Sequence, residues 1–182
     1  MSNAQAIRAA VLTVSDRCAA GTAVDASGPA VQAFVREQLS GEVVNAALLP
    51  DEPDRIEHLL RGWCRIDEGG CGIDLVLVTG GTGLGPRDRT PEAAMRVIER
   101  PHPGLMELAR IRSMESSRDR TGIADPRSFL SRAVAGATGV TLIVTLPGSP
   151  RGATETLHAI ADILPHAIRM LRGDQSPGAH RR

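Results

Sequence analysis

Hydrophobic and polar positions along the chain follow two periods, one typical of buried strands and the other of amphipathic helices. Short apolar runs of four to eight residues predict buried strands, and they occupy residues 9–15, 42–49, 73–79 and 140–146. Between them, apolar residues recur at helical spacing and predict helices over residues 28–40, 53–63, 91–99, 103 to about 115, and 153–171. Ser27 is placed to cap the first of these helices.

This order of elements predicts the fold class. Strands and helices alternate nearly throughout, which is typical of an α/β fold with a mostly parallel sheet and helices on both faces. The polar stretch 116–127 is predicted to be a flexible or partner-facing loop. A length of 182 residues with 42% hydrophobic content fits one domain over residues 1–175, followed by a loose tail over residues 176–182.

Composition and charge exclude several classes of partner. The 21 basic and 21 acidic side chains cancel, so no global field recruits nucleic acid or an anionic membrane, and any anion site must be local. No apolar run approaches the roughly 18 residues of a membrane span, and the N-terminus lacks a signal peptide, so we expect a cytoplasmic protein. The 3 scattered cysteines fit reduced thiols and match no zinc spacing.

The absence of lysine and tyrosine excludes particular mechanisms. All 21 basic residues are arginine, so the chain has neither the lysine of a Walker A loop nor an amine for Schiff-base catalysis. None of the 5 histidines forms a recognisable nucleophile pattern with serine or cysteine.

Loops that follow parallel strands gather at one edge of the sheet, and here they are rich in glycine and hydroxyl groups. In the loop after residue 79, Gly80, Gly81, Gly83 and Gly85 allow positive φ and close backbone approach, which favours an anion-binding row of N–H groups. A second glycine loop covers residues 147–152. The glycines could instead serve only to turn a strand into a helix that Thr90 caps.

Charged residues in these loops favour phosphate and a cation. Arg87, Arg89 and Arg151 supply guanidinium groups suited to phosphate oxygens. Asp51 and Asp88 lie among them, and Mg²⁺ prefers one or two carboxylates together with phosphate oxygens. Asp25 is a weaker third candidate. The open alternatives are that Asp51 caps the second helix and that Asp88 pairs with a neighbouring arginine.

Eight ordered segments carry a family resemblance. They are Thr13–Asp16, Asp25–Gly28, Pro50–Glu52, Thr79–Gly83, Pro86–Asp88, Thr90–Ala93, Leu130–Arg132 and Leu146–Pro150. In this order they resemble the molybdopterin adenylyltransferase family, which includes the G domains of gephyrin and of its plant counterpart. The resemblance runs from about residue 9 to residue 172.

The resemblance implies a three-layer α/β/α domain, usually a homotrimer, that binds molybdopterin and ATP. With Mg²⁺ it would adenylate the terminal phosphate of molybdopterin, release pyrophosphate and pass the product to a molybdate-inserting partner protein. The alternative is a non-catalytic molybdopterin-binding or scaffold trimer of the same family.

The resemblance also implies roles for individual positions. Asp51 and Asp88 match the essential acids, and we expect both to be catalytic and to hold the metal. The positions expected to bind substrate are Ser15, Asp16, Asp25, Ser27, Gly28, Thr79, Gly80, Gly81, Thr82, Gly83, Arg87, Thr90, Glu92, Ser131, Arg132, Pro147, Gly148, Ser149 and Pro150.

Overall fold

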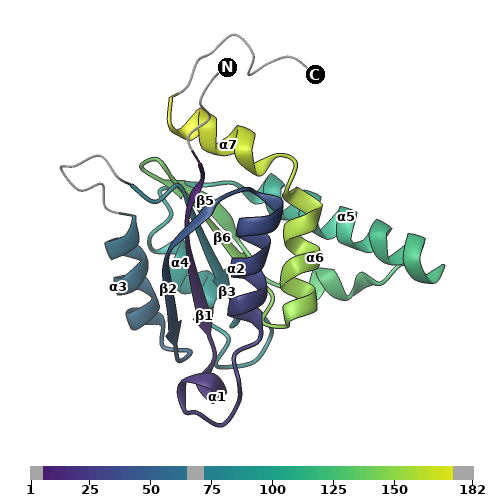
Figure 1. The fold of residues 1–182 in the computed structure, drawn as a ribbon. Coiled ribbons are helices and arrows are strands. Elements are labelled where there is room, and N and C mark those ends of the chain that lie inside the picture. The colour runs from purple at the N-terminus through teal and green to yellow at the C-terminus, as the bar shows by residue number, and fades with distance from the viewer. Residues whose placement is uncertain (1–5, 65–71, 174–182) are drawn as a thin grey trace.

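A computed structural model describes residues 6–64 and 72–173 of the chain (Figure 1). The predicted tail, residues 176–182, lies outside this range. Its elements are β1 (Arg8–Val14), α1 (Asp16–Ala19), α2 (Ser27–Gln38), β2 (Glu42–Leu49), α3 (Pro53–Trp63), β3 (Leu75–Thr79), α4 (Thr90–Met95), β4 (Arg100–Pro101), α5 (Pro103–Thr121), the 3-10 helix η1 (Pro126–Leu130), β5 (Ala135–Thr138), β6 (Thr141–Leu146), α6 (Pro150–Ile160) and α7 (Leu164–Leu171).

The described strands form one sheet in the order β2-β1-β3-β6-β5-β4. The neighbours among β2, β1, β3 and β6 are parallel, whereas β5 and β4 join as antiparallel strands at one edge. Thr13 of β1 pairs with Thr79 of β3, which in turn pairs with Leu146 of β6. The carboxyl ends of these three strands are therefore in line, and the loops that follow them leave the sheet side by side.

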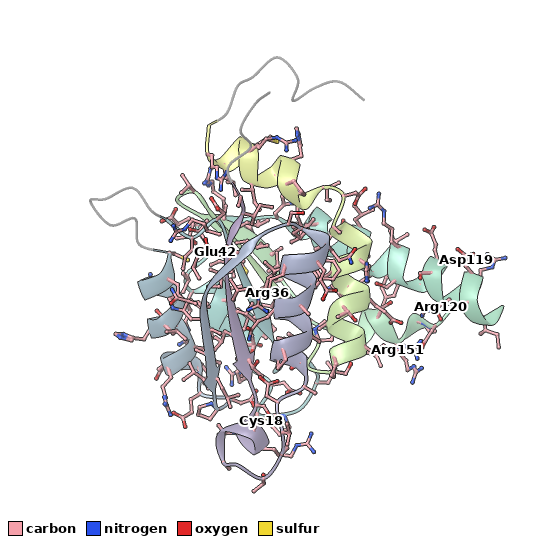
Figure 2. All side chains as sticks on the ribbon, in the orientation of Figure 1. Cys18, Arg36, Glu42, Asp119, Arg120 and Arg151 are labelled. Carbon is pink, nitrogen blue, oxygen red and sulfur yellow. The ribbon has the colours of Figure 1, made fainter. Side chains whose placement is uncertain are left out.

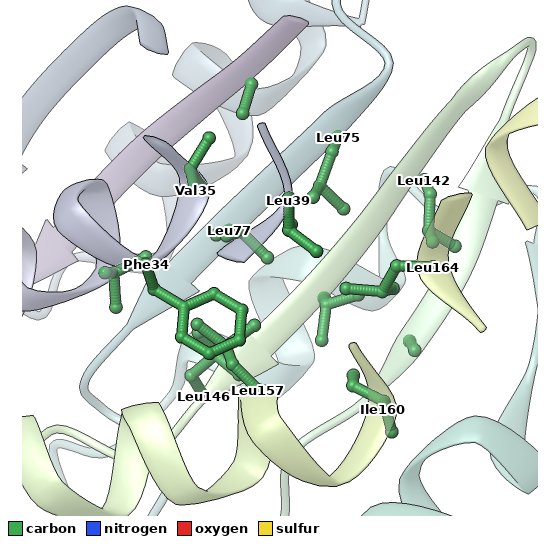
Figure 3. Close-up of a cluster of buried hydrophobic side chains, with 14 of the residues drawn as sticks. Phe34, Val35, Leu39, Leu75, Leu77, Leu142, Leu146, Leu157, Ile160 and Leu164 are labelled. Atoms are coloured by element: carbon green, nitrogen blue, oxygen red, sulfur yellow. The ribbon is translucent and has the colours of Figure 1, made fainter. Parts of the chain in front are cut away.

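Alternate side chains of the central strands enter two separate cores. Leu75 and Leu77 of β3 pack with α2, α5, α6 and α7, whereas Val76 and Val78 pack with α3 and α4 on the other face. Figure 3 shows the first core, where Phe34 of α2 lies near Leu157 of α6. Every residue of β3 is buried, as expected for a strand covered on both faces. The predicted three-layer α/β/α architecture with a mostly parallel sheet is confirmed.

The prediction of a loop over residues 116–127 is wrong for its first half. Helix α5 continues to Thr121 and ends at Gly122, whose φ of 75° is the left-handed conformation that closes many helices. The stretch lacks an apolar stripe because it projects from the body of the protein (Figure 1). Arg120 stabilises it by donating to Ser116 Oγ at 3.1 Å and to Glu155 Oε1 of α6 at 2.8 Å.

Three further features differ from the expected elements. The single helix predicted over residues 153–171 is divided into two helices, α6 and α7. The division occurs because Pro165 lies in the first turn of α7, where proline favours the start of a helix. Strand β4 has only 2 residues, and β5 has 4 small residues, so neither shows a strand pattern in the sequence. Ser27 does not cap α2, because the cap position is Ala26 and makes no side-chain bond.

No helix in the described ranges is long and apolar enough to cross a membrane.

A buried ion pair joins the end of α7 to the edge of the sheet where β1 and β3 begin. Asp74 precedes β3, and its side chain is only 8% exposed. Arg172, directly after α7, donates from Nε to Asp74 Oδ1 at 2.7 Å, and the backbone N–H of Arg8 donates to Asp74 Oδ2 at 2.8 Å. This contact therefore ties α7 to the beginning of β1 and β3.

Replacing Arg172 with methionine should lower the free energy of unfolding by about 3 kcal/mol, because it leaves a buried carboxylate without its cation. The matched control is Arg55→Met, which removes an exposed ion pair to Glu52 at 3.5 Å and should cost at most about 1 kcal/mol. Urea denaturation followed by circular dichroism measures both, and equal losses would contradict a special role for the buried pair.

Candidate functional site

The glycine loop after β3 approaches two neighbouring loops through its backbone. Gly80 has a φ of 107°, and a Cβ at this position would lie 2.0 Å from the carbonyl oxygen of Val14. A Cβ at Gly148 would lie 3.1 Å from Gly80 Cα, so the glycine loops after β3 and β6 are in contact. Any side chain at position 80 would force these strand ends apart.

The same loop presents a row of free amides. Gly81 has a φ of 62°. Within the described parts of the chain, the N–H groups of Gly81, Thr82 and Gly83 donate no hydrogen bond, whereas the N–H of Gly80 donates to Leu146 O at 3.1 Å. Consecutive free N–H groups near a residue with positive φ are the geometry that binds anions.

Gly83 and Gly85 serve a different purpose from the one expected, because neither has a positive φ. A Cβ at either position would lie 2.7 Å from Asp88 Oδ2, which accepts the N–H of Gly85 at 2.8 Å. The carboxylate of Asp88 therefore folds back onto its own loop. The alternative pairing with Arg87 or Arg89 is absent from the ion pairs of the described residues, and Asp88 Oδ1 accepts no hydrogen bond there.

Asp51 and Thr90 each present a buried oxygen without a partner at the same point. Asp51 Oδ1 and Thr90 Oγ1 both lack a hydrogen bond within the described structure. A Cβ built on Gly81 would meet Thr90 Oγ1 at 2.3 Å and Asp51 Oδ1 at 2.6 Å, so both oxygens face the space above Gly81. Because a buried polar atom without a partner costs free energy, these two oxygens mark a place for a ligand.

The structure also answers whether Asp51 and Thr90 cap the helices that follow them. Glu52 and Arg89 occupy the cap positions of α3 and α4, and neither cap involves a side-chain hydrogen bond. Asp51 and Thr90 are therefore not helix caps. Burial raises the pKa of Asp51, and the charges of Asp16 and Asp88 act in the same direction.

Asp16 connects the loops after β1, β2 and β3. Its Oδ1 accepts the N–H of Asp51 at 3.0 Å, and its own N–H donates to Asp51 Oδ2 at 3.1 Å. Arg87 grips the same carboxylate with two bonds, from Nε at 2.9 Å and from Nη2 at 2.8 Å. The Arg87 guanidinium lowers the pKa of Asp16, so Asp16 is held ionised while it positions the Asp51 backbone.

Asp25 is saturated by the residues around it. Its Oδ2 accepts from Thr13 Oγ1 at 2.7 Å, and its Oδ1 accepts from the N–H of Gly28 at 2.9 Å and from Ser27 Oγ at 3.3 Å. A Cβ at Gly28 would lie 2.4 Å from Asp25 Oδ2. These residues fix the loop that leads into α2.

Several hydroxyls expected at the site are also engaged within the protein. Thr79 Oγ1 donates to Pro147 O at 2.7 Å, and Thr82 Oγ1 lies 3.1 Å from Ser131 Oγ. Ser15 and Ser149 cap α1 and α6 by accepting backbone N–H groups. Pro150 begins α6, and Glu92 of α4 pairs with Arg132. The contacts of Thr79, Thr82 and Glu92 join the loop after β3 to the loop after β6, and they join the first of these loops and α4 to the segment before β5.

A cavity of about 430 Å³ opens beside this cluster, between α5, η1 and α6. Its lining includes Ser131, Pro147 and Ser149 from the loops and the arginines Arg110, Arg120, Arg127 and Arg151. Figure 2 shows Arg120 and Arg151 on the same side of the molecule, where both donate to Glu155 Oε1 at 2.8 Å. Except for Arg151, sequence reasoning missed these arginines, because they lie on the stretch predicted as a loop and in a helix of low apolar content.

Comparison with known proteins identifies the family. Residues 10–166 match the family described as "probable molybdopterin binding domain". The chain belongs to this molybdopterin-binding domain family. The molybdopterin biosynthesis enzyme MoaB from Thermus thermophilus is similar in structure, with a TM-score of 0.76 and 44% identity, and the match covers 92% of this chain and 98% of that one.

Curated relatives of this molybdopterin-binding domain differ in length. The molybdopterin adenylyltransferase of Helicobacter pylori is 37% identical over 171 residues, which are 93% of this chain and 90% of the relative. The molybdenum cofactor synthesis protein cinnamon of Drosophila melanogaster is 34% identical over 172 residues, which are 94% of this chain. The chain spans only 27% of the length of cinnamon.

The acids of this molybdopterin-binding domain do not form a closed metal centre. In the ranges that the structure describes, no group of three or more His, Cys, Asp or Glu side chains could hold a metal ion. The open oxygens of Asp51, Thr90 and Asp88 fit a hard cation such as Mg²⁺, which takes few protein ligands and completes its shell with phosphate and water.

Replacing Asp51 with asparagine should raise the thermal unfolding midpoint at pH 7. Burial raises the pKa of Asp51, so the folded protein loses stability when this carboxyl ionises. The gain should fade as the pH falls through the raised pKa of Asp51, and it should be gone below the ordinary aspartate pKa of about 3.9, where the carboxyl is protonated in both states. Thermal unfolding of both proteins over this pH range measures the effect.

Asp16→Asn provides the control of opposite sign. Arg87 lowers the pKa of Asp16, so the ionised carboxylate stabilises the fold and its loss should lower the midpoint at pH 7. This difference should disappear as the pH falls through the lowered pKa of Asp16. Shifts of the same sign in the two variants would contradict the assigned environments.

Proposed function

We propose that the chain is a molybdopterin adenylyltransferase of molybdenum cofactor biosynthesis. It transfers AMP from ATP to the terminal phosphate of molybdopterin and passes the adenylylated pterin to a molybdate-inserting partner. The Helicobacter pylori relative of that name supports this proposal, because the match covers nearly all of both chains. The observation that carries it is the row of free amides of Gly81, Thr82 and Gly83 beside the unpartnered oxygens of Asp51 and Thr90.

The proposed reaction joins two phosphorylated molecules. An oxygen of the molybdopterin phosphate attacks the α-phosphorus of ATP, one P–O bond forms, and the bond from the α-phosphorus to pyrophosphate breaks. Such transfers need positioning and charge stabilisation more than covalent chemistry, which fits a chain without lysine. The amides of Gly81 to Gly83 would bind the pterin phosphate and hold it for in-line attack.

The acids have a separate part in this proposal. Asp51 and Asp88 would hold Mg²⁺, with the Thr90 hydroxyl at its side, because each of these groups keeps an oxygen that the described protein does not use. Bound Mg²⁺ would neutralise the charge that two phosphorylated substrates bring together. Without a cation, Asp51 and Asp88 would repel the phosphates that the neighbouring amides attract.

Asp51→Asn and Asp88→Asn should each reduce turnover by at least about two orders of magnitude, because removing one preorganised charge-stabilising group has about this effect. The measurement is formation of adenylylated molybdopterin and pyrophosphate from ATP and molybdopterin with saturating Mg²⁺. The matched control is Asp54→Asn, which changes a side chain that is 95% exposed in the first turn of α3 and should keep the wild-type rate.

The same assay separates the enzyme from a binding or scaffold protein of this family. A binding protein would retain molybdopterin in calorimetry yet form no adenylylated product, and this outcome would refute the proposed activity. Near-wild-type rates in both aspartate variants would refute the roles assigned to Asp51 and Asp88.

We also propose that the protein assembles as a homotrimer, which is the state that the family resemblance implies. Ile111, Phe129 and Leu130 on the projecting arm of α5 and η1 are between 46% and 58% exposed, and they offer an apolar surface for another copy. Light scattering at micromolar concentration should give about three times the mass of one chain. A monomer under these conditions would contradict the assembly.

A further inference from the structure

Arg132 donates hydrogen bonds to backbone carbonyl oxygens near both ends of the glycine loop that follows β3. Its Nε donates to the carbonyl oxygen of Gly83 at 2.8 Å, and its Nη2 donates to the carbonyl oxygen of Asp88. Its Nη1 donates to Glu92 Oε1 at the start of α4. The backbone N–H of Arg132 adds a fourth bond, to the carbonyl oxygen of Thr82 at 2.8 Å.

Apart from these bonds, the segment is tied to another loop through Arg87, whose guanidinium donates two hydrogen bonds to the Asp16 carboxylate. Gly83 and Gly85 lose more conformational entropy on ordering than other residues do, and Leu84 is 72% exposed. Within the segment itself, the N–H of Asp88 donates to Gly85 O at 3.0 Å, and the Asp88 carboxylate accepts the N–H of Gly85. The guanidinium group therefore links the loop to the segment before β5 and to α4.

We propose that Arg132 is a positioning residue for Asp88 and for the free amides of Gly81 to Gly83. It acts on the reaction by holding the Gly83–Asp88 backbone in place, and it is not a ligand of the substrate phosphate. This inference rests on the proposed function, and it replaces the expectation that Arg132 contacts substrate. Its chemistry requires arginine, because one planar fork reaches two carbonyl oxygens and a carboxylate at once, whereas lysine offers a single nitrogen.

The first test measures the loop itself and needs no activity. In Arg132→Met, amide hydrogen exchange should become at least about tenfold faster at Asp88 and Thr90, whose N–H groups donate to Gly85 O and Gly81 O. Exchange at Asp74, whose N–H donates to Arg8 O at the opposite end of β3, should not change. The control is Arg172→Met, which should accelerate exchange at Asp74 and leave Asp88 and Thr90 unchanged.

The second test is kinetic. Arg132→Met and Arg132→Lys should both lower kcat by roughly a hundredfold with little change in KM for molybdopterin, since a small misplacement of reacting groups has about this effect. If Arg132 acts through Asp88, adding Arg132→Met to Asp88→Asn should reduce the rate by less than about threefold more. A raised KM with unchanged kcat, or losses that multiply in the double variant, would make Arg132 a substrate ligand and overturn the proposal.

The two tests fail independently of the proposed function. If the wild-type protein forms no adenylylated molybdopterin, the proposed activity is refuted, while hydrogen exchange still decides whether Arg132 holds the loop. If exchange at Asp88 and Thr90 is unchanged in folded Arg132→Met, the positioning role is refuted even in an active enzyme.

Discussion

Close backbone contact among the loops after β1, β3 and β6 is the constraint on which the candidate site depends. Thr13, Thr79 and Leu146 stand side by side in the parallel register, so the three strands end together. A Cβ at Gly80 would lie 2.0 Å from the Val14 carbonyl oxygen, and a Cβ at Gly148 would lie 3.1 Å from Gly80 Cα. Because the backbones meet, the short side chains of several loops can share one small space.

Within that space, the four aspartates divide according to their hydrogen bonds. Asp16 is held by Arg87, and Asp25 is saturated by hydroxyl and N–H groups, so both shape the loops. Asp51 and Asp88 each use one oxygen for the fold and leave the other without a partner among the described residues. The two carboxylate oxygens left free therefore lie in the loops after β2 and β3.

The arginines show the same division of tasks. Arg87 and Arg132 use their guanidinium groups on carboxylates and carbonyls of the protein, and thereby hold loops that are rich in glycine. Arg120 and Arg151 share Glu155 on the wall of the cavity. The number of arginines near a glycine loop therefore overstates how many are free to bind a phosphate. A guanidinium group binds carboxylate and carbonyl oxygens of the protein equally well.

The sequence by itself determined the layers, because the period of its apolar residues distinguishes the doubly buried strands from the helices that cover them. It also indicated which loops meet, since loops that follow parallel strands leave the same edge of a sheet. It failed for the outer half of α5, where polar residues form a projecting helix without an apolar stripe, and for the short strands β4 and β5.

Only the tertiary structure decided which groups remain free. In the sequence, the hydroxyls of Ser131, Thr82 and Thr79 look available to a ligand. Each of them instead forms a hydrogen bond with a residue at least 49 positions away along the chain. Conversely, Thr90 looks like a helix cap, yet its hydroxyl is buried without a partner opposite Asp51. Whether two distant loops form a hydrogen bond depends on differences of a few tenths of an ångström in the distance between donor and acceptor. Local residue patterns carry no information about this distance.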